Sequence, residues 1–177
     1  MKLKIKIKRI DGGIIPKSHK KGDWVDLHSN ATFSLMSPQA GTLKSHTING
    51  ETVKHRDVSF DYFKIPLGVA MKLPKGFEAV VVPRSSSCEK FGIIQANSIG
   101  VIDNSYSGNN DEWKMPVVAI RDTLINTGDR VCQFRIQLSQ KANIFQKIKW
   151  LLSSGIEIVE VESLDNKDRG GFGSTGR

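Results

Sequence analysis

Three short segments carry residue types that could bind a phosphate ester and activate water against it. Asp103 follows the apolar run Ile99-Gly100-Val101-Ile102, so its carboxylate stands where a strand should end and could be held there as a general base. The segment Arg84-Ser85-Ser86-Ser87 follows another apolar run and offers several hydrogen-bond donors in one turn, as anion sites do. The C-terminal Gly170-Gly171-Phe172-Gly173-Ser174 resembles a phosphate loop but lacks the lysine and the following helix of a P-loop.

Each segment also has a purely structural interpretation. Asp103 could start a turn by bonding its own backbone, and Arg84 could belong to a structural ion pair. The glycine-rich end could be only a flexible tail. The residues by themselves leave these alternatives open.

Composition narrows the classes of protein. The chain has 177 residues and a formal net charge of +8, which favours polyanionic partners such as nucleotide phosphates, nucleic acid or an anionic surface. Aromatic residues make up 7% and are not interleaved with the basic ones, so stable nucleic-acid binding is not expected. No stretch approaches the ~18 apolar residues of a membrane span. Cys88 and Cys132 cannot build a disulfide scaffold, so we expect a cytoplasmic protein.

The elements that must position these segments read as strands. Short runs rich in Val, Ile and Phe alternate with turns of Gly, Pro, Asn and Asp, which is typical of an all-β sandwich or barrel. We expect strands at residues 2–10, 65–71, 78–82, 116–120, 130–138 and 156–161. The pattern predicts one β domain over residues 1–164 and a flexible tail over 165–177.

Two stretches break this rhythm. Residues 30–60 are polar and are expected to form an excursion, such as a hairpin with an irregular tip. Residues 142–152 predict a helix, with Asn143 as its N-cap and an apolar face at helical spacing. Phe145 and Trp150 lie in this helix beside lysines, so it could dock a regulatory protein partner. Packing onto the sandwich is the favoured interpretation.

Five segments in order resemble the motifs of the trimeric dUTPase (deoxyuridine 5'-triphosphate nucleotidohydrolase) family. They are Gly22-Asp23-Trp24-Val25-Asp26-Leu27, Pro83-Arg84-Ser85-Ser86-Ser87, Gly100-Val101-Ile102-Asp103-Asn104-Ser105-Tyr106-Ser107-Gly108, Gly128-Asp129-Arg130-Val131-Cys132-Gln133 and Arg169-Gly170-Gly171-Phe172-Gly173-Ser174-Thr175-Gly176. The third matches the family pattern at every fixed position. Ser86 replaces the usual glycine, and Lys167 rather than Arg169 has the usual spacing of the last basic residue.

The resemblance implies a fold and a reaction. The fold would be a jelly-roll, and the reaction would be hydrolysis of dUTP to dUMP and pyrophosphate by Mg²⁺-assisted attack of water on the α-phosphate. Such activity limits uracil in DNA and supplies dUMP for thymidylate synthesis. The family also implies a homotrimer, in which one chain supplies the first, second and fourth motifs, a second supplies the third motif and the third chain supplies the tail.

Residue roles follow from the resemblance by position. Asp103 would be the general base, Tyr106 would pack under the deoxyribose, and Asn97 with the backbone of Val101 and Ile102 would read uracil. Phe172 would stack on the base, and Asp26 would hold Mg²⁺ through water. The phosphates would be bound by Arg84, Ser85, Ser86, Gln133, Arg169, Gly173 and Ser174.

Two other functions remain as alternatives. A dCTP deaminase shares the fold but needs a glutamate from the strand after the third motif, and Pro116–Ile120 offers none. A ligand-gated regulatory binding module on the same fold is the second alternative. The intact Asp103, Tyr106 and Gln133 argue against a site that has lost catalysis.

Overall fold

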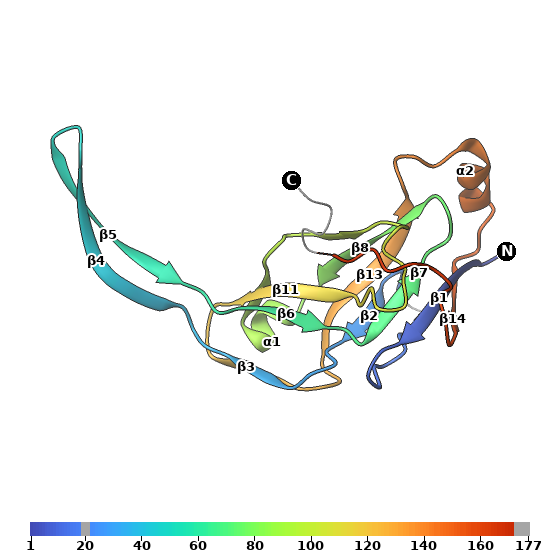
Figure 1. Ribbon diagram of the computed structural model, residues 1–177, viewed down its shortest axis with the longest axis horizontal. Coiled ribbons are helices and arrows are strands. Elements are labelled where there is room, and N and C mark those ends of the chain that lie inside the picture. Colours follow the sequence, from blue (N-terminus) through green and yellow to red (C-terminus); the bar gives the residue numbers. More distant parts are fainter. Residues whose placement is uncertain (19–21, 172–177) are drawn as a thin grey trace.

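A computed structural model describes residues 1–18 and 22–171 of the chain. The architecture is all-β, as the sequence predicts (Figure 1). The strands are β1 (Leu3–Arg9), β2 (Val25–His28), β3 (Phe33–Leu35), β4 (Gln39–Ile48), β5 (Glu51–Ser59), β6 (Tyr62–Pro66), β7 (Val69–Lys72), β8 (Phe77–Pro83), β9 (Ile93–Gln95), β10 (Gly100–Ile102), β11 (Lys114–Ala119), β12 (Thr123–Ile125), β13 (Arg130–Leu138) and β14 (Ile156–Glu160). The helices are α1 (Ser87–Phe91) and α2 (Ile144–Leu151).

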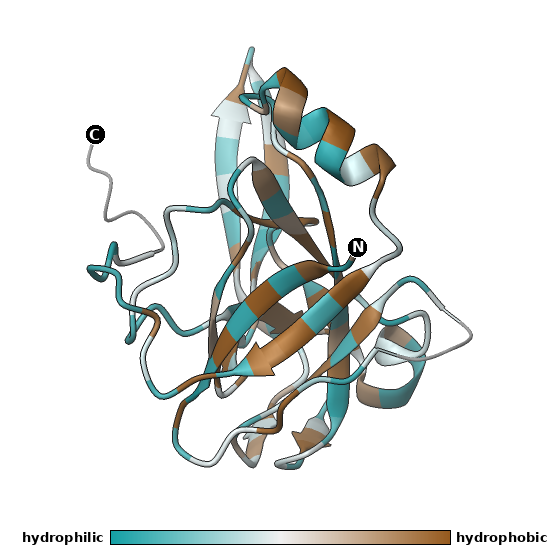
Figure 2. Cartoon of the chain, turned by 90° about the vertical axis from the view of Figure 1, so that its right-hand side faces the viewer, coloured by the Kyte–Doolittle hydropathy of each residue, from teal (hydrophilic) through white to brown (hydrophobic). Residues whose placement is uncertain are grey.

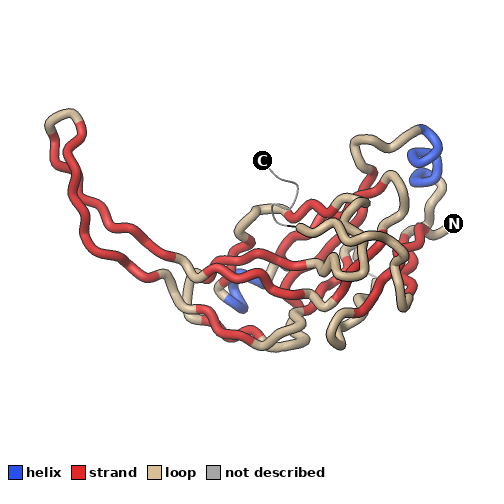
Figure 3. The backbone as a smooth tube through the Cα atoms, in the orientation of Figure 1, coloured by secondary structure: helices blue, strands red, loops and turns tan. Residues whose placement is uncertain are grey.

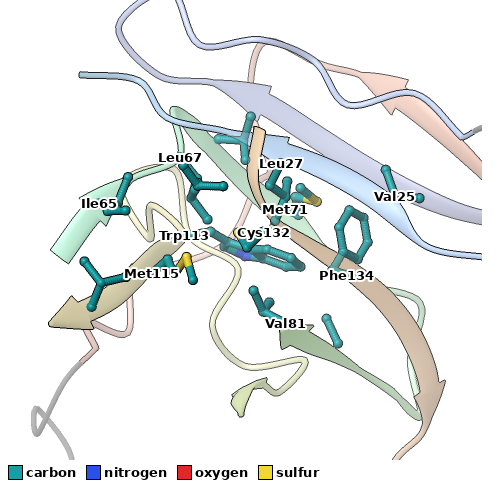
Figure 4. Packing of buried hydrophobic residues seen from close by; sticks show 14 of the residues in the cluster. Val25, Leu27, Ile65, Leu67, Met71, Val81, Trp113, Met115, Cys132 and Phe134 are labelled. Carbon is teal, nitrogen blue, oxygen red and sulfur yellow. The ribbon is translucent and has the colours of Figure 1, made fainter. Parts of the chain in front are cut away.

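Three sheets enclose the core. Their strand orders are β14-β1-β7, β10-β8-β13-β2 and β6-β11-β9, with β12–β3 and β4–β5 as separate pairs. Trp113 is fully buried at the centre, and its ring meets Phe134 edge-on at 5.2 Å (Figure 4). Trp113 is therefore a core residue, and its large aromatic ring fills the space between the sheets.

The N-terminal strand shows why the alternating sequence folds this way. Leu3, Ile5 and Ile7 are completely buried, while the intervening lysines lie toward solvent, and this alternation is visible beside the N-terminus in Figure 2. β1 pairs in parallel with β14 and antiparallel with β7. The core of the domain is thus closed by strands from both ends of the chain.

The polar excursion is a long hairpin that projects from the body of the molecule (Figure 3). Every residue of β4 is exposed, and β4 pairs antiparallel with β5. Asn49 and Gly50 join the strands with φ angles of 52° and 84°, the left-handed values of a two-residue hairpin turn. The expectation of an irregular tip is therefore wrong, because the Asn-Gly pair forms a regular two-residue turn.

Helix α2 confirms the predicted helix and its cap. The Asn143 side chain accepts the backbone N–H of Gln146, and the Gln146 side chain accepts the N–H of Asn143. None of its residues is buried, and Phe145 and Leu151 are 78% and 82% exposed. The Trp150 ring packs against the Phe77 ring, with ring centroids 5.4 Å apart. The favoured interpretation of a helix packed onto the sandwich is therefore wrong for most of its apolar face.

Within residues 1–18 and 22–171, neither helix has the length and apolarity that a membrane crossing requires.

Candidate active site

A cavity of about 280 Å³ lies beside β10 and the loop that follows it. Its lining brings together six of the residues that the sequence predicts for the site, namely Asn97, Val101, Ile102, Asp103, Tyr106 and Arg169. The volume is close to the lower end, ~300 Å³, of sites for small molecules. The third predicted motif and the start of the tail thus share one cavity within a single chain.

Strand β10 supplies backbone groups to this cavity. It pairs with β8 and ends the strand order β10-β8-β13-β2 of the described residues. An edge strand presents N–H and C=O groups that are not used within its own sheet. The backbone around Val101 and Ile102 is therefore suited to hydrogen-bond the edge of a planar base, as the sequence predicts.

Asp103 is held by two partners. Its Oδ1 accepts the backbone N–H of Ser105 at 2.8 Å and the Ser105 hydroxyl, and its Oδ2 accepts Nη1 of Arg169 at 2.5 Å. Partial burial raises the pKa of Asp103, but the hydrogen bonds from Ser105 and Arg169 outweigh it and hold that pKa below its ordinary value. The carboxylate both starts a turn and stays ionised, which a general base requires.

Tyr106 forms one wall of the cavity. Its hydroxyl donates to the carbonyl oxygen of Glu112 at 2.8 Å, and burial raises the pKa of Tyr106 to about 12. The backbone of Gly171 lies against the ring, so a Cβ at that position would approach it to 3.1 Å. The ring is fixed in place and can set the space left for a sugar.

Asn97 has a buried neighbour that the sequence analysis did not identify. Gln95 is 5% exposed, and its Nε2 donates to Oδ1 of Asn97 at 2.9 Å and to the carbonyl oxygen of Val81 at 3.3 Å. Its Oε1 has no hydrogen-bond partner among the described residues. Gln95 therefore orients the Asn97 amide. The sequence offered one signal for Gln95: it lies two positions before Asn97, and residues two apart in an extended chain point to the same side.

The remaining predicted residues form a second group at the other end of β8. Asp26 accepts Nε of Arg84 at 2.8 Å and Nη1 of Arg130 at 3.0 Å. Gln133 pairs with Asp26 in register, and its Nε2 lies 3.5 Å from the carbonyl oxygen of Pro83. Asp26 thus fixes the direction of Arg84 beside the serine turn.

The serine turn tolerates its departure from the family pattern. Ser86 has φ −89°, an ordinary value for a residue with a side chain, so no glycine is needed there. Ser85 is exposed, and the buried Ser87 ties the turn to the core by donating to the carbonyl oxygen of Val131 at 2.7 Å. The turn keeps its N–H groups near Arg84.

The two groups are far apart within one chain. β10 runs antiparallel to β8 with Gly100 opposite Val81, so Arg84 and Asp103 follow opposite ends of the pair. Six residues of strand separate them, which corresponds to about 20 Å. The same phosphate group cannot contact both side chains of a single subunit.

The structure gives limited support to Asp26 as a metal residue. Both carboxylate oxygens accept hydrogen bonds from arginines, so the side chain does not suit direct coordination of Mg²⁺. In the described part of the chain, no group of three or more His, Cys, Asp or Glu residues could hold a metal ion. The contact of Asp26 with Mg²⁺ through water stays a prediction.

Part of the predicted tail cannot be placed. Phe172, Gly173 and Ser174 lie outside the described residues. The described part of the tail, 165–171, brings Arg169 to Asp103 of its own chain, whereas Lys167 is exposed. The division into a domain and a flexible tail stays a prediction.

Comparisons with known proteins give the family. A model of the dUTPase family matches residues 29–176. The SPbeta prophage-derived deoxyuridine 5'-triphosphate nucleotidohydrolase of Bacillus subtilis is 43% identical over 158 residues, covering 89% of this chain and 86% of that protein. The deoxyuridine 5'-triphosphate nucleotidohydrolase of Finegoldia magna is 36% identical over 148 residues, covering 81% and 89%.

Solved structures agree on the fold. A dUTPase from Streptococcus mutans superposes with a TM-score of 0.59 at 18% identity, covering 78% of this chain and 98% of that one. A mutant dUTPase from phage phi11 of Staphylococcus aureus, which coordinates a structural Mg(II) ion, has a TM-score of 0.59 at 15% identity and covers 79% and 94%. The extent of the family match and the identity to the relatives, together with the shared fold, show that the chain belongs to the dUTPase family.

Proposed function

We propose that this protein hydrolyses dUTP to dUMP and pyrophosphate, which would limit uracil in DNA and supply dUMP. The observation that carries the proposal is the cavity in which Asp103, Tyr106 and Asn97 meet the open edge of β10. The relatives named for this activity support it. The two free thiols, Cys88 and Cys132, are compatible with the reducing cytoplasm as its location.

The chain's own residues divide the work. The ionised Asp103 takes the proton from the attacking water, a role worth roughly 10²–10⁴-fold in rate. Tyr106 fills the space in which a 2′-hydroxyl would lie, and Asn97 with the β10 backbone hydrogen-bonds the base. Arg84, Ser85, Ser86 and Gln133 stabilise the phosphates through charge and N–H donors. Phe172, Gly173 and Ser174 are assigned to closure over the substrate by family resemblance.

The complete site needs a second subunit. About 20 Å of strand separates Arg84 from Asp103 within one chain. The residues that bind the phosphates must therefore come from a neighbouring copy of the chain. A homotrimer with sites at its interfaces, as the family implies, meets this requirement.

Magnesium is expected to arrive with the triphosphate. Mg²⁺ keeps several waters and binds mainly substrate phosphates, which fits a site without a carboxylate cage. When bound, it would neutralise charge on the phosphates. Asp26 would act at most through water, because its oxygens face Arg84 and Arg130.

The geometry disfavours a deaminase. β11, the strand after the third motif, carries no carboxylate. Glu112 lies at the cavity, but its Oε1 accepts the N–H of Gly68 at 3.0 Å and its Oε2 lies 3.5 Å from Nζ of Lys114. Neither β11 nor Glu112 therefore supplies a free carboxylate for the deamination of a cytosine base.

The decisive experiment is pyrophosphate release with Mg²⁺ from dUTP, dCTP, dTTP and UTP. We expect release from dUTP and a loss of at least about a hundredfold in Asp103→Asn. A folded protein that releases none from dUTP would refute the hydrolase. Ammonia from dCTP would then indicate the deaminase, and tight dUTP binding without turnover the regulatory module.

A second role in docking a regulatory protein partner is favoured by the exposed face of α2. If this face is a free surface, Phe145→Ser should change the free energy of unfolding by no more than about 0.5 kcal/mol. Trp150→Ser, which removes the contact with Phe77, should cost more. Both variants are compared with the wild type by thermal unfolding and by their oligomeric state. An equally large loss of unfolding free energy in the two would mean that this face of α2 is packed in the assembly.

A further inference from the structure

Two amide side chains at the cavity are joined in a fixed order. Gln95 ends β9, is 5% exposed and lines the cavity together with Asn97. Its Nε2 donates to the carbonyl oxygen of Val81 at 3.3 Å and to Oδ1 of Asn97 at 2.9 Å. The N–H of Ser98 donates to the carbonyl oxygen of Gln95 at 3.2 Å, so the turn holds the two amides close together. A backbone carbonyl, a buried amide and an exposed amide thus form one chain of hydrogen bonds.

The backbone carbonyl fixes the direction of the buried amide. A carbonyl oxygen only accepts hydrogen bonds, so the Gln95 atom that faces Val81 must be the nitrogen. The reverse orientation would place Oε1 of Gln95 against the Val81 oxygen, with no hydrogen between them, which is an unfavourable contact for two buried acceptors. The direction of the Gln95 amide is therefore set by the main chain of β8.

The exposed amide takes its direction from the buried one. Nε2 of Gln95 carries only hydrogens toward Asn97, so the Asn97 atom that faces it must be Oδ1. Nδ2 of Asn97 is then the amide atom left for the cavity, and no described residue accepts a hydrogen bond from it. An asparagine amide by itself can present either an acceptor or two donors. The Val81 carbonyl, acting through Gln95, limits Asn97 to its donors.

A pair of N–H donors suits a carbonyl oxygen of the base. Uracil carries two such oxygens, O2 and O4. An amino group on a base would meet the N–H donors of Asn97 with further donors, which forms no hydrogen bond. Gln95 is buried and its donors are used by Val81 and Asn97, so it acts on the base only through Asn97.

We propose that Gln95 is a positioning residue that sets the polarity of Asn97, so that the cavity presents N–H donors to a carbonyl oxygen of the base. Gln95 transmits the acceptor character of the Val81 carbonyl to the substrate site across one side chain. Because the ligand is taken to be a uracil nucleotide, the assignment of the base rests on the proposed dUTP hydrolysis. The order of hydrogen bonds from Val81 to Asn97 does not depend on it.

Binding of dUDP, measured by calorimetry, tests the polarity without turnover. Gln95→Glu keeps the shape of the side chain but turns a carboxyl oxygen toward Asn97, whether the carboxyl group is ionised or donates its proton to Val81. The Asn97 amide must then reverse and present Oδ1 to the cavity. We expect Kd for dUDP to rise at least about tenfold, and further than in Gln95→Leu, in which Asn97 can take either direction. The opposite order, with Gln95→Leu the weaker binder, would mean that Gln95 only fills space and would overturn the proposal.

A double-mutant cycle tests whether Gln95 acts through Asn97. In an Asn97→Ala background, Gln95→Glu should change Kd less than about twofold, because no amide is left to reverse. An equal loss in both backgrounds would mean that Gln95 acts independently of Asn97, which contradicts the positioning role. Thermal unfolding checks that each variant is folded, and if Gln95→Glu is not, Gln95→Leu enters the same cycle with the same expectation.

Modified nucleotides and a matched control complete the test. In 2-thio-dUDP and 4-thio-dUDP a sulfur, which accepts hydrogen bonds weakly, replaces one carbonyl oxygen of the base. One of the two should bind the wild type more weakly than dUDP and lose its sensitivity to Gln95→Glu, whereas undiminished sensitivity of both would show that Asn97 meets no base carbonyl. Gln39→Glu removes another glutamine whose Nε2 donates to a backbone carbonyl, that of Ser37, and should leave Kd unchanged. A wild type that binds dUDP but releases no pyrophosphate from dUTP would refute the hydrolase alone, because the binding cycle still decides the role of Gln95.

Discussion

Two inactive variants of this chain are expected to rescue each other when they assemble together. Asp103→Asn removes the proposed general base at one end of the β8–β10 pair. Arg84→Met removes the charge proposed to bind phosphate at the other end while keeping the aliphatic stem. About 20 Å of strand separates the two positions, so the intact residue of each variant should serve a different interface.

The size of the rescue follows from symmetry. In a trimer with two chains of one variant and one of the other, the three interfaces differ in the order of their chains. Only one interface combines an intact Arg84 from one chain with an intact Asp103 from the next. A purified mixed trimer should therefore recover about one third of the wild-type activity, while each variant alone loses roughly 10²-fold or more.

The assay needs two affinity tags. The variants are co-expressed with different tags, mixed oligomers are isolated over both resins, and pyrophosphate release from dUTP is measured per trimer. Mixed trimers no more active than either parent would refute the two-subunit site. The control is a mixture of Asp103→Asn chains carrying the two tags, which should stay inactive.

Three further predictions concern the cavity and the hairpin. Arg169→Met should move the acid limb of kcat/KM to higher pH, because the base must be ionised and its pKa rises when the guanidinium is lost; an unmoved limb in the pH profile would contradict this. Gln95→Leu leaves the carbonyl of Val81 and the Asn97 amide without their donor, so KM for dUTP should rise at least about tenfold in steady-state assays, and an unchanged KM would refute its orienting role. Replacing residues 40–58 by Asn-Gly joins Gln39 to Ser59, which are paired in register, and should change the free energy of unfolding by less than about 0.5 kcal/mol in thermal melts; a much larger loss would mean that the hairpin is packed.

Local patterns in the sequence determined the elements. Alternation placed Leu3, Ile5 and Ile7 inside β1, and spacing with a capping residue predicted α2. The Asn49-Gly50 pair already specified the regular hairpin tip, because both residues adopt the left-handed backbone angles that this turn requires. Asp103 and Tyr106 share a cavity because they lie three residues apart in one contiguous loop.

Only the tertiary structure decided which distant groups meet. Arg169 reaches Asp103 across 66 residues, and Asp26 is joined to Arg84 and Arg130 across 58 and 104 residues. Side-chain periodicity extends over one element, whereas these contacts depend on which strands pair and in which register. The tertiary structure likewise decided that the apolar face of α2 is exposed. It also decided that Asp111 is buried, with the N–H groups of Arg169 and Gly170 bonded to its carboxylate. A turn aspartate has the same local sequence whether water or a folded segment satisfies its carboxylate.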